Sequence, residues 1–375
     1  MCPDVMDRPD WYRLKSPASL ATPALLVYPE RIKANIASMI SIAGGSDRLQ
    51  PHVKTHKMAE VVRLKMEAGI TRFKCATIAE VEMVAACGAG EALLANQPVG
   101  PQAERLAAVA ERYPDTRLGA CVDDLTVAGR LSRVFGGGGK TVDLYVDLDV
   151  GMERTGIAVG DRALELYETL RRLPAVAAVG WHVYDGHLGG LDSAGRKEAF
   201  TAYSAGVDAL IERTKDSEGR LPPFVAGGSP SFELHAGRGW GRVSPGTAVF
   251  WDSQYARAFP ELPFVYAALV ATRVLSCPGS GRLCLDLGYK AVSAEAEPPH
   301  ASLFELPGYR QVLQNEEHLV VEHPEASNFQ PGDLLMGVPR HICPTVALYD
   351  EALVVEDGGI ADRWRVTARG RRISV

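Results

Sequence analysis

The stretch VDLYVDLDVGMERTG (142–156) joins a valine- and leucine-rich run to a glycine-containing loop. A short apolar run of this kind is typical of a buried β-strand. Similar runs recur from about residue 49 to 255, separated by amphipathic stretches such as AEVVRLKMEAG, and eight strands with crossover helices predict an α/β fold, a (β/α)8 barrel of the TIM type. The other seven runs are LQPHVK (49–54), FKCAT (73–77), EALLAN (91–96), RLGACVD (117–123), AVGWHVYDG (178–186), PPFVAGG (222–228) and RVSPGTAVF (242–250).

The sequence changes in character after about residue 260. Runs such as FVYAALVATRVLSC (264–277) are strand-like, are divided by Gly and Pro turns and show little helical period. They predict a C-terminal all-β domain that follows the barrel. We therefore expect three regions: an N-terminal segment that pairs with the β-domain, the barrel, and the β-domain, at residues 1–22, 23–258 and 259–375.

Composition excludes several classes of protein. The 375 residues are 46% hydrophobic and carry a net charge of −6, with no block of basic residues, so we expect neither nucleic-acid nor membrane-surface binding. No apolar run reaches the length of a membrane span, and the N-terminus is unlike a signal peptide. The seven cysteines are odd in number and form no C-x-x-C pair, which predicts free thiols in a reducing cytoplasm.

Several functional side chains follow the ends of the predicted strands, where barrel enzymes place their catalytic groups. Lys54 follows the first strand, Arg154 the fifth and Tyr184 the sixth. Gly228-Ser229 and Gly246-Thr247 lie in the loops of strands 7 and 8, where phosphate sites are common. A lysine facing a phosphate-binding pair of loops suits pyridoxal phosphate.

Each of these residues also has a purely structural explanation. A lysine at a strand end is usually a solvated charge, and a Gly-Ser pair is usually a turn. Arg154 can simply neutralise Asp149 or Glu153. The argument for a cofactor site rests on their common position at one end of one barrel.

A second pair of candidate residues is His341 and Cys343, separated by Ile342. If this segment is a strand, residues i and i+2 face the same side, so both side chains reach one ion. Imidazole and thiolate suit Zn²⁺, with positions left for water or substrate. By itself, however, the pattern more often marks two packed side chains.

An ordered set of motifs spans nearly the whole chain and resembles the D-serine dehydratase and D-threonine aldolase family, which is similar to the N-terminal domain of alanine racemase. The lysine motif is PHVKTHK (51–57), and DVGMERTG (149–156) resembles the D-x-G-x-x-R-x-G of the racemases. The remaining matches include GGSPS (227–231), PGTAVFWD (245–252), LDLGYKAVSAE (285–295) and PRHICPTVALYDEALVVEDG (339–358).

The resemblance implies a role for each candidate residue. Lys54 would form the internal aldimine with pyridoxal 5'-phosphate, with Lys57 as the rival lysine, while Arg154 would contact the ring oxygen and Tyr184 would lie close to the ring. The phosphate would lie among four residues. A divalent metal would bind to a pair of residues, with Zn²⁺ favoured by the ligand types and Mn²⁺ or Mg²⁺ as alternatives. These are Gly228, Ser229, Gly246 and Thr247 for the phosphate, and His341 and Cys343 for the metal.

The implied activity is that of a lyase acting on β-hydroxy D-amino acids, in a homodimer, and we expect D-threonine aldolase with D-serine dehydratase as the alternative. The motif at 285–295 and the C-terminal run favour D-threonine aldolase, whereas His-x-Cys, PHVKTHK and GGSPS favour D-serine dehydratase. A 3-hydroxy-D-aspartate aldolase or dehydratase is a further alternative of the same class. An amino-acid racemase or a non-catalytic cofactor-binding protein would be of another class, but neither gives the His-x-Cys pair a role.

Overall fold

The computed structural model describes residues 10–279 and 281–375. Contacts between Cα atoms divide these residues into two compact units, and each is discontinuous in sequence. The barrel unit comprises Met39–Lys54, Val62–Gly246 and Gly370–Val375. The sheet unit comprises residues 10–38, Thr55–Val61 and, apart from residue 280, Thr247–Arg369. The domain boundaries expected at residues 22 and 258 stay a prediction, and residues 1–9 of the expected N-terminal segment lie outside the described part.

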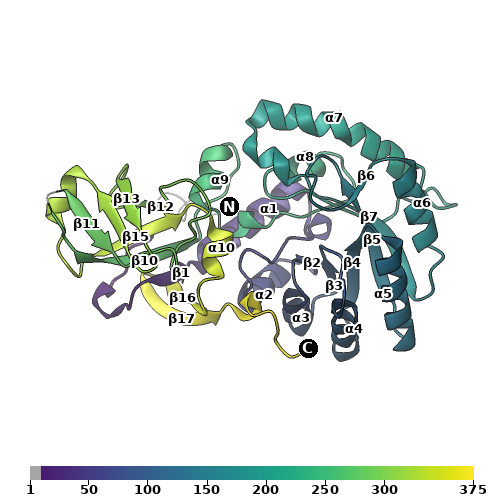
Figure 1. The fold of residues 1–375 in the computed structure, drawn as a ribbon, viewed down its shortest axis with the longest axis horizontal. Coiled ribbons are helices and arrows are strands. Elements are labelled where there is room, and N and C mark those ends of the chain that lie inside the picture. Colours follow the sequence, from purple (N-terminus) through teal and green to yellow (C-terminus); the bar gives the residue numbers. More distant parts are fainter. Residues whose placement is uncertain (1–9, 280) are drawn as a thin grey trace. The chain divides into compact units, whose positions relative to one another are not determined.

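The barrel unit is built on a parallel sheet with the strand order β2-β3-β4-β5-β7-β8-β9, and the short strand β6 pairs with β5 (Figure 1). The predicted α/β barrel fold is confirmed. The strands are β2 (Arg72–Cys75), β3 (Glu91–Leu94), β4 (Arg117–Val122), β5 (Val142–Asp149), β6 (Ile157–Ala158), β7 (Val176–Val183), β8 (Phe224–Ala226) and β9 (Arg242–Val243).

The first expected strand, at residues 49–54, is not a continuous strand. It forms two isolated parallel bridges, Leu49 with Val243 of β9 and His52 with Lys74 of β2. The segment therefore joins the two edge strands of the sheet and occupies the place of the eighth strand. Pro51 lies between the bridges and has no N–H to donate to a ladder, which explains the interruption. Likewise, only two residues of the expected strand 242–250 are extended.

Helices alternate with these strands and lie outside the sheet, as Figure 1 shows for α3 to α6. Their N-termini carry the polar caps that the backbone N–H groups of a first turn require: Asp124 accepts from Thr126 and Val127, and Asp192 from Gly195. The helices of the chain are α1 (Pro29–Ala43), α2 (Ala59–Glu67), α3 (Ile78–Ala86), α4 (Gln102–Arg112), α5 (Leu125–Gly137), α6 (Asp161–Leu170), α7 (Ser193–Glu212), α8 (Phe232–Ala236), α9 (Ser253–Ala258) and α10 (Ile342–Val346).

The barrel interior is filled by side chains, with Tyr145 of β5 at its centre. Leu93, Cys121, Tyr145 and Val225 form one buried cluster from four different strands. Gly180 of β7 makes room for the tyrosine, because a Cβ there would lie 2.9 Å from its ring. The interior is thus a packed core of side chains, as in other barrels of this type, and a ligand site belongs at the strand ends.

The sheet unit holds a sheet with the order β13-β14-β11-β10-β1-β16-β17, in which β15 pairs with β10 and β12. Its pairings are antiparallel except for β1 with β16, so a strand from the beginning of the chain lies between two from its end. The strands are β1 (Ala24–Val27), β10 (Ala268–Ser276), β11 (Arg282–Leu285), β12 (Ala301–Leu303), β13 (Arg310–Gln314), β14 (Leu319–Glu322), β15 (Leu334–Pro339), β16 (Glu351–Glu356) and β17 (Gly359–Arg365).

Strand β10 supports both faces of this sheet. Leu269 and Ala271 belong to one hydrophobic cluster, and Val270 and Val274 to another. This division follows from the period of two residues in a strand, which points successive side chains to opposite faces. The expected C-terminal all-β region is therefore confirmed as an antiparallel sheet that also takes in β1.

Two further expectations concern the chain as a whole. Within residues 10–279 and 281–375, no helix combines the length and the apolar character needed to cross a bilayer. The six described cysteines form no disulfide, and Cys2 lies outside the described residues.

Candidate functional site

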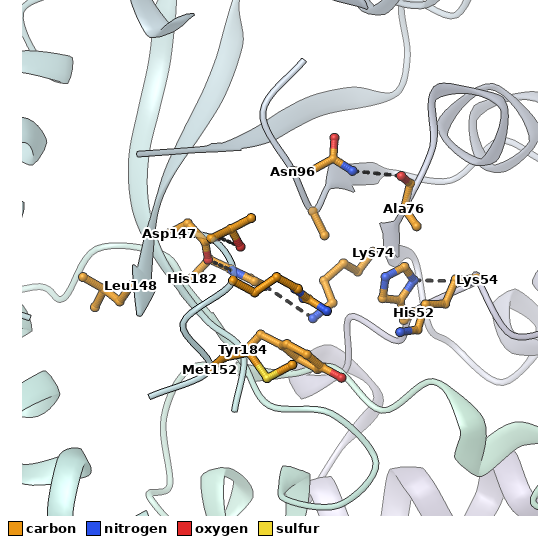
Figure 2. A pocket seen from close by; sticks show the side chains of 13 residues that line it. His52, Lys54, Lys74, Ala76, Asn96, Asp147, Leu148, Met152, His182 and Tyr184 are labelled. Atoms are coloured by element: carbon orange, nitrogen blue, oxygen red, sulfur yellow. Dashed lines mark hydrogen bonds and ion pairs between the residues drawn. The ribbon is translucent and has the colours of Figure 1, made fainter. Parts of the chain in front are cut away.

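A cavity with an accessible volume of about 280 Å³ opens at the carboxyl ends of the barrel strands (Figure 2). This volume is close to the lower end of the range for small-molecule sites, roughly 300 to 1,000 Å³. Three residues expected at the site, Lys54, Arg154 and Tyr184, all line it. The complete lining is His52, Lys54, Lys74, Ala76, Ala95, Asn96, Asp147, Leu148, Met152, Arg154, Thr155, His182 and Tyr184.

The ring of Tyr184 is the common neighbour of the cations in this cavity. The Nζ atom of Lys54 lies 5.8 Å from the ring centroid, and the guanidinium carbon of Arg154 lies 5.1 Å from it. Lys54 directly follows the bridge segment, and its backbone N–H donates to Nδ1 of His52. The rival Lys57 is not among the lining residues and has a left-handed backbone, with a φ of 53°. The geometry therefore favours Lys54 over Lys57 as the reactive lysine.

The loop that carries Arg154 is held by hydrogen bonds from its own motif. Oδ1 of Asp149 accepts from the backbone N–H groups of Gly151 and Glu153. Gly156 has a φ of +103°, and a Cβ at this position would lie 2.8 Å from the backbone nitrogen of Asp149. The spacing D-x-G-x-x-R-x-G thus has a physical cause: the first and last residues close the loop that presents the arginine.

A buried polar chain beside the ring was not foreseen from the sequence. Nζ of Lys74 lies 3.4 Å from Nε2 of His182, whose Nδ1 lies 2.6 Å from Asp147, which also accepts from the Thr155 hydroxyl (Figure 2). Burial lowers the pKa of Lys74 to about 8. Burial and the nearby Lys74 charge also lower the pKa of His182, so a neutral imidazole joins the ammonium to the carboxylate.

The glycine loop after β8 packs directly against the same tyrosine. A Cβ on Gly228 would lie 3.0 Å from Cε2 of Tyr184, so any other residue here would have to displace the ring slightly. The loop after β9 lies beside it, because Gly246 donates its backbone N–H to the Ser229 hydroxyl, 3.1 Å away. Three of the four expected phosphate residues are therefore neighbours in the barrel unit.

The loop after β8 is braced from behind by Asp185, the residue after Tyr184. Its carboxylate is buried and accepts from the hydroxyls of Ser231 and Tyr203, while Nε2 of His235 lies 3.0 Å away. Burial opposes ionisation, but His235 and these hydroxyls outweigh it and lower the pKa of Asp185 to about 2. A permanent carboxylate therefore fixes the loop that begins the expected phosphate site.

These features fit pyridoxal phosphate. The cavity offers a lysine, an aromatic face and a guanidinium, and the adjoining loops offer a backbone without Cβ atoms and a hydroxyl near Gly246. Glycine residues let the backbone of such a loop approach an anion such as phosphate closely. Tyr184 contacts both sets of residues and so connects the two parts of the site.

The pair expected to bind a metal lies in the sheet unit, and its local structure differs from the expectation. His341 and Cys343 are not in a strand: β15 ends at Pro339, and Cys343 belongs to the short helix α10. The helix begins here because Oδ2 of Asp252 accepts the N–H of Ile342, and Pro344 is tolerated in a first turn. Alternation along a strand was therefore the wrong reason for bringing the two side chains together.

The two side chains nevertheless have the surroundings of ligands. Nδ1 of His341 is hydrogen-bonded to Glu295, an arrangement common for the non-ligating nitrogen of a metal-bound histidine. The Cys343 sulfur lies 3.2 Å from the Thr55 hydroxyl and 3.5 Å from that of Thr247. Thr247, expected at the phosphate, thus also neighbours the thiol in the sheet unit.

The charge of His341 follows from these neighbours. Burial disfavours the imidazolium, but a hydrogen bond to Cys343 and the nearby carboxylates outweigh it and raise the pKa of His341 to about 9. Within residues 10–279 and 281–375, no three His, Cys, Asp or Glu side chains are arranged to hold a metal ion. An ion on this pair would take its other ligands from water or substrate.

Two family models match the chain. Residues 27–254 match the alanine racemase N-terminal domain, and residues 267–355 match a putative serine dehydratase domain. The first match covers the barrel strands and ends near the loop after β9. The second begins one residue before β10 and includes His341 and Cys343.

Similar proteins span almost the same length as this chain. A D-threonine aldolase of Arthrobacter sp is 29% identical over 359 residues, which are 94% of each chain. A 3-hydroxy-D-aspartate aldolase of Paracoccus denitrificans is 26% identical and covers 94% of this chain and 93% of its own. The solved D-threonine aldolase from Filomicrobium marinum superposes with a TM-score of 0.87 at 28% identity, covering 95% of this chain and 97% of its own. With its parallel barrel, its strand-end lysine and a match over residues 27–254, the chain belongs to the alanine racemase N-terminal domain family.

Proposed function

We propose that this chain is a pyridoxal-phosphate-dependent, metal-assisted lyase that cleaves D-threonine to glycine and acetaldehyde. One observation carries the proposal: Lys54 and Arg154 lie over the same Tyr184 ring in a cavity at the strand ends. The full-length similarity to two aldolases of β-hydroxy D-amino acids supports the choice of reaction.

The residues of the chain divide the work between attachment and orientation. Lys54 would carry the cofactor, which when bound supplies an electron sink for cleavage at the substrate α-carbon. Arg154 would hold an anionic oxygen of the ring, and Tyr184 would support the ring face. Gly228, Ser229, Gly246 and Thr247 would line the phosphate site, where the two glycines let the backbone approach the phosphate closely.

We further propose that His341 and Cys343 hold a divalent metal, with zinc favoured by the imidazole and thiolate ligands and Mn²⁺ or Mg²⁺ as alternatives. A bound ion of this kind lowers the pKa of a coordinated hydroxyl group. Glu295 supports the assignment, because a carboxylate on the other nitrogen of a ligating histidine fixes its orientation.

A dehydratase is the second candidate function. The match of residues 267–355 to a putative serine dehydratase domain favours it, as does a cysteine in the metal pair. A racemase fits the barrel but gives the His341–Cys343 pair no role. We also propose that the protein is a homodimer and is located in a reducing cytoplasm. Light scattering of the purified protein measures its oligomeric state.

Product analysis with D-threonine tests the reaction. Glycine and acetaldehyde in equal amounts are the expected products, and Lys54→Ala is the control that should form neither. The products 2-oxobutyrate and ammonia would instead establish a dehydratase. L-allo-Threonine, the product of inversion at the α-carbon alone, would establish a racemase.

A further inference from the structure

Lys74 is a buried lysine on the inner face of β2, and nothing above gives it a role. Its side chain is only 2% exposed, yet it lines the cavity. Burying an ammonium is costly unless hydrogen bonds compensate for the lost water. Here Nζ lies 3.4 Å from Nε2 of His182 and 3.5 Å from the carbonyl oxygen of Gly227. Two of its three N–H donors are thereby used.

The partners of Lys74 indicate its charge. The carboxylate of Asp147 accepts a hydrogen bond from Nδ1–H of His182. Nε2 of the neutral ring is therefore an acceptor, and Lys74 is the donor in the contact between them. The pKa of Lys74, lowered by burial to about 8, still leaves it mostly protonated at neutral pH. His182 and Gly227 thus hold the ammonium in place, and one of its N–H groups remains available for a ligand.

The Lys74 ammonium lies near the same aromatic ring as the two other cations of the cavity. Nζ of Lys74 lies 5.6 Å from the centroid of the Tyr184 ring, comparable to 5.8 Å for Lys54 and 5.1 Å for the Arg154 guanidinium (Figure 2). Three cations therefore surround one ring. Of the lining residues that the structure describes, Asp147 alone is a carboxylate, and His182 and Thr155 occupy it. Such an excess of positive charge is complementary to an anionic ligand.

We propose that Lys74 is a second cationic contact of the cofactor, whose ammonium, held by His182 and Gly227, binds an anionic oxygen of the bound pyridoxal phosphate. This inference rests on the proposed function. It assigns the contact to the cofactor and not to the substrate carboxylate because Lys74 is almost fully buried. A substrate enters from the solvent side after the cofactor is in place.

The test compares cofactor affinity of apoprotein variants. Lys74→Met keeps the length of the side chain and removes the charge, and Lys57→Met, in the neighbouring lysine motif, is the matched control. A charge-assisted hydrogen bond predicts that Lys74→Met weakens pyridoxal phosphate binding on the order of 10- to 100-fold. Lys57→Met should bind within threefold of wild type. Both affinities are measured by titrating the apoprotein and following absorbance.

A double variant guards against a merely structural effect. Lys74→Met removes the positive charge that faces Asp147 across His182, and loss of one partner of a buried charge pair can destabilise a protein. Lys74→Met/Asp147→Asn removes both charges, and we expect the same loss of affinity in an apoprotein that unfolds at the wild-type temperature. Pyridoxal, which lacks the phosphate, identifies the oxygen: a penalty that persists assigns the ring oxygen, and one that vanishes assigns the phosphate.

The outcomes separate this inference from the proposed function. If wild-type apoprotein binds pyridoxal phosphate on Lys54 but the double variant binds it equally well, Lys74 is no cofactor contact and the inference alone is wrong. If the variants bind the cofactor normally but bind added glycine, the amino-acid product, more weakly, the contact belongs to the substrate carboxylate and the inference is also wrong. If wild-type protein binds no pyridoxal phosphate, the proposed function itself fails.

Discussion

The cavity of the barrel unit and the His341–Cys343 pair of the sheet unit are organised in different ways. In the cavity, charged groups from distant strands are brought together by closure of the barrel, and Lys74, Asp147 and His182 are buried. The proposed metal pair consists of two residues at the start of one short helix, with the His341 side chain 37% exposed. The barrel site therefore depends on tertiary closure, whereas the pair depends on its immediate hydrogen bonds.

Removing either member of the pair should have the largest effect. We expect His341→Ala and Cys343→Ala each to lower turnover of D-threonine by about a thousandfold or more, because a Lewis acid contributes several kcal/mol at a developing charge. The visible absorbance of the bound cofactor should remain, since its proposed contacts, apart from Thr247, lie in the barrel unit. His323→Ala, a histidine outside the pair, is the control. If the Ala variants keep near-wild-type turnover after exhaustive chelation, His341 and Cys343 only pack against their neighbours and bind no catalytic metal.

The buried cation of the barrel should be visible in the dependence of stability on pH. The pKa of folded Lys74, about 8, lies below its ordinary value of 10.5. The folded state therefore binds fewer protons between these values, and its stability should rise as pH increases from about 8 to 10.5. Buried Lys65, whose pKa is also lowered, adds to this rise in every variant, so the prediction is a difference: denaturant unfolding should show that wild-type apoprotein gains about 2 to 3 kcal/mol more than Lys74→Met over this range, and Lys57→Met should gain as much as wild type. Parallel curves for wild type and Lys74→Met would mean that Lys74 is not buried as a cation.

Glu295 tests whether the metal pair depends on its local hydrogen bonds. Glu295→Gln keeps the shape of the side chain but weakens the hold on Nδ1 of His341, so zinc affinity should fall about 10- to 100-fold. Competition with a chromophoric chelator gives this affinity without an activity assay. Glu316→Gln, which removes an exposed ion pair with Lys290, should change nothing. Equal zinc affinities for the two variants would exclude an orienting role for Glu295.

The smallest expected effect concerns the packing of Tyr184 on the glycine loop. Gly228→Ala places a methyl group 3.0 Å from the ring, and relief of that contact should cost about 1 to 2 kcal/mol, roughly tenfold in cofactor affinity. Gly190→Ala adds a methyl group with no heavy atom within 4 Å and is the matched control. If both variants bind the cofactor alike, the close approach of ring and backbone is not needed.

The sequence predicted the barrel because seven of its strand segments are apolar runs bounded by turn residues. The segment 49–54 departs from a strand at Pro51, yet its place in the barrel was still recognisable from Lys54 and its neighbours. Lys54, Arg154 and Tyr184 could be predicted because each lies within a few residues of the end of an expected strand. The side chains that the structure brings together around them depend on closure and not on adjacency in sequence.

Lys74 and His182 were missed for that reason. Each is a single polar residue within an apolar run, FKC and GWHV, and alternation does point both inward, but nothing local says that they meet. The signal that could have found them is a charge at an inward position of a buried strand. At His341 the error was of another kind: a period of two was assumed where Pro344 indicates the first turn of a helix.

The most direct test of the account is to identify the residue that carries the cofactor. Protein incubated with pyridoxal phosphate is reduced with borohydride, digested and mapped by mass spectrometry, in wild type and in Lys54→Ala. The account predicts a single modified lysine, Lys54, in wild type and none in the variant. Modification of Lys57 or Lys74 in wild type, or an adduct that persists in Lys54→Ala, would contradict it.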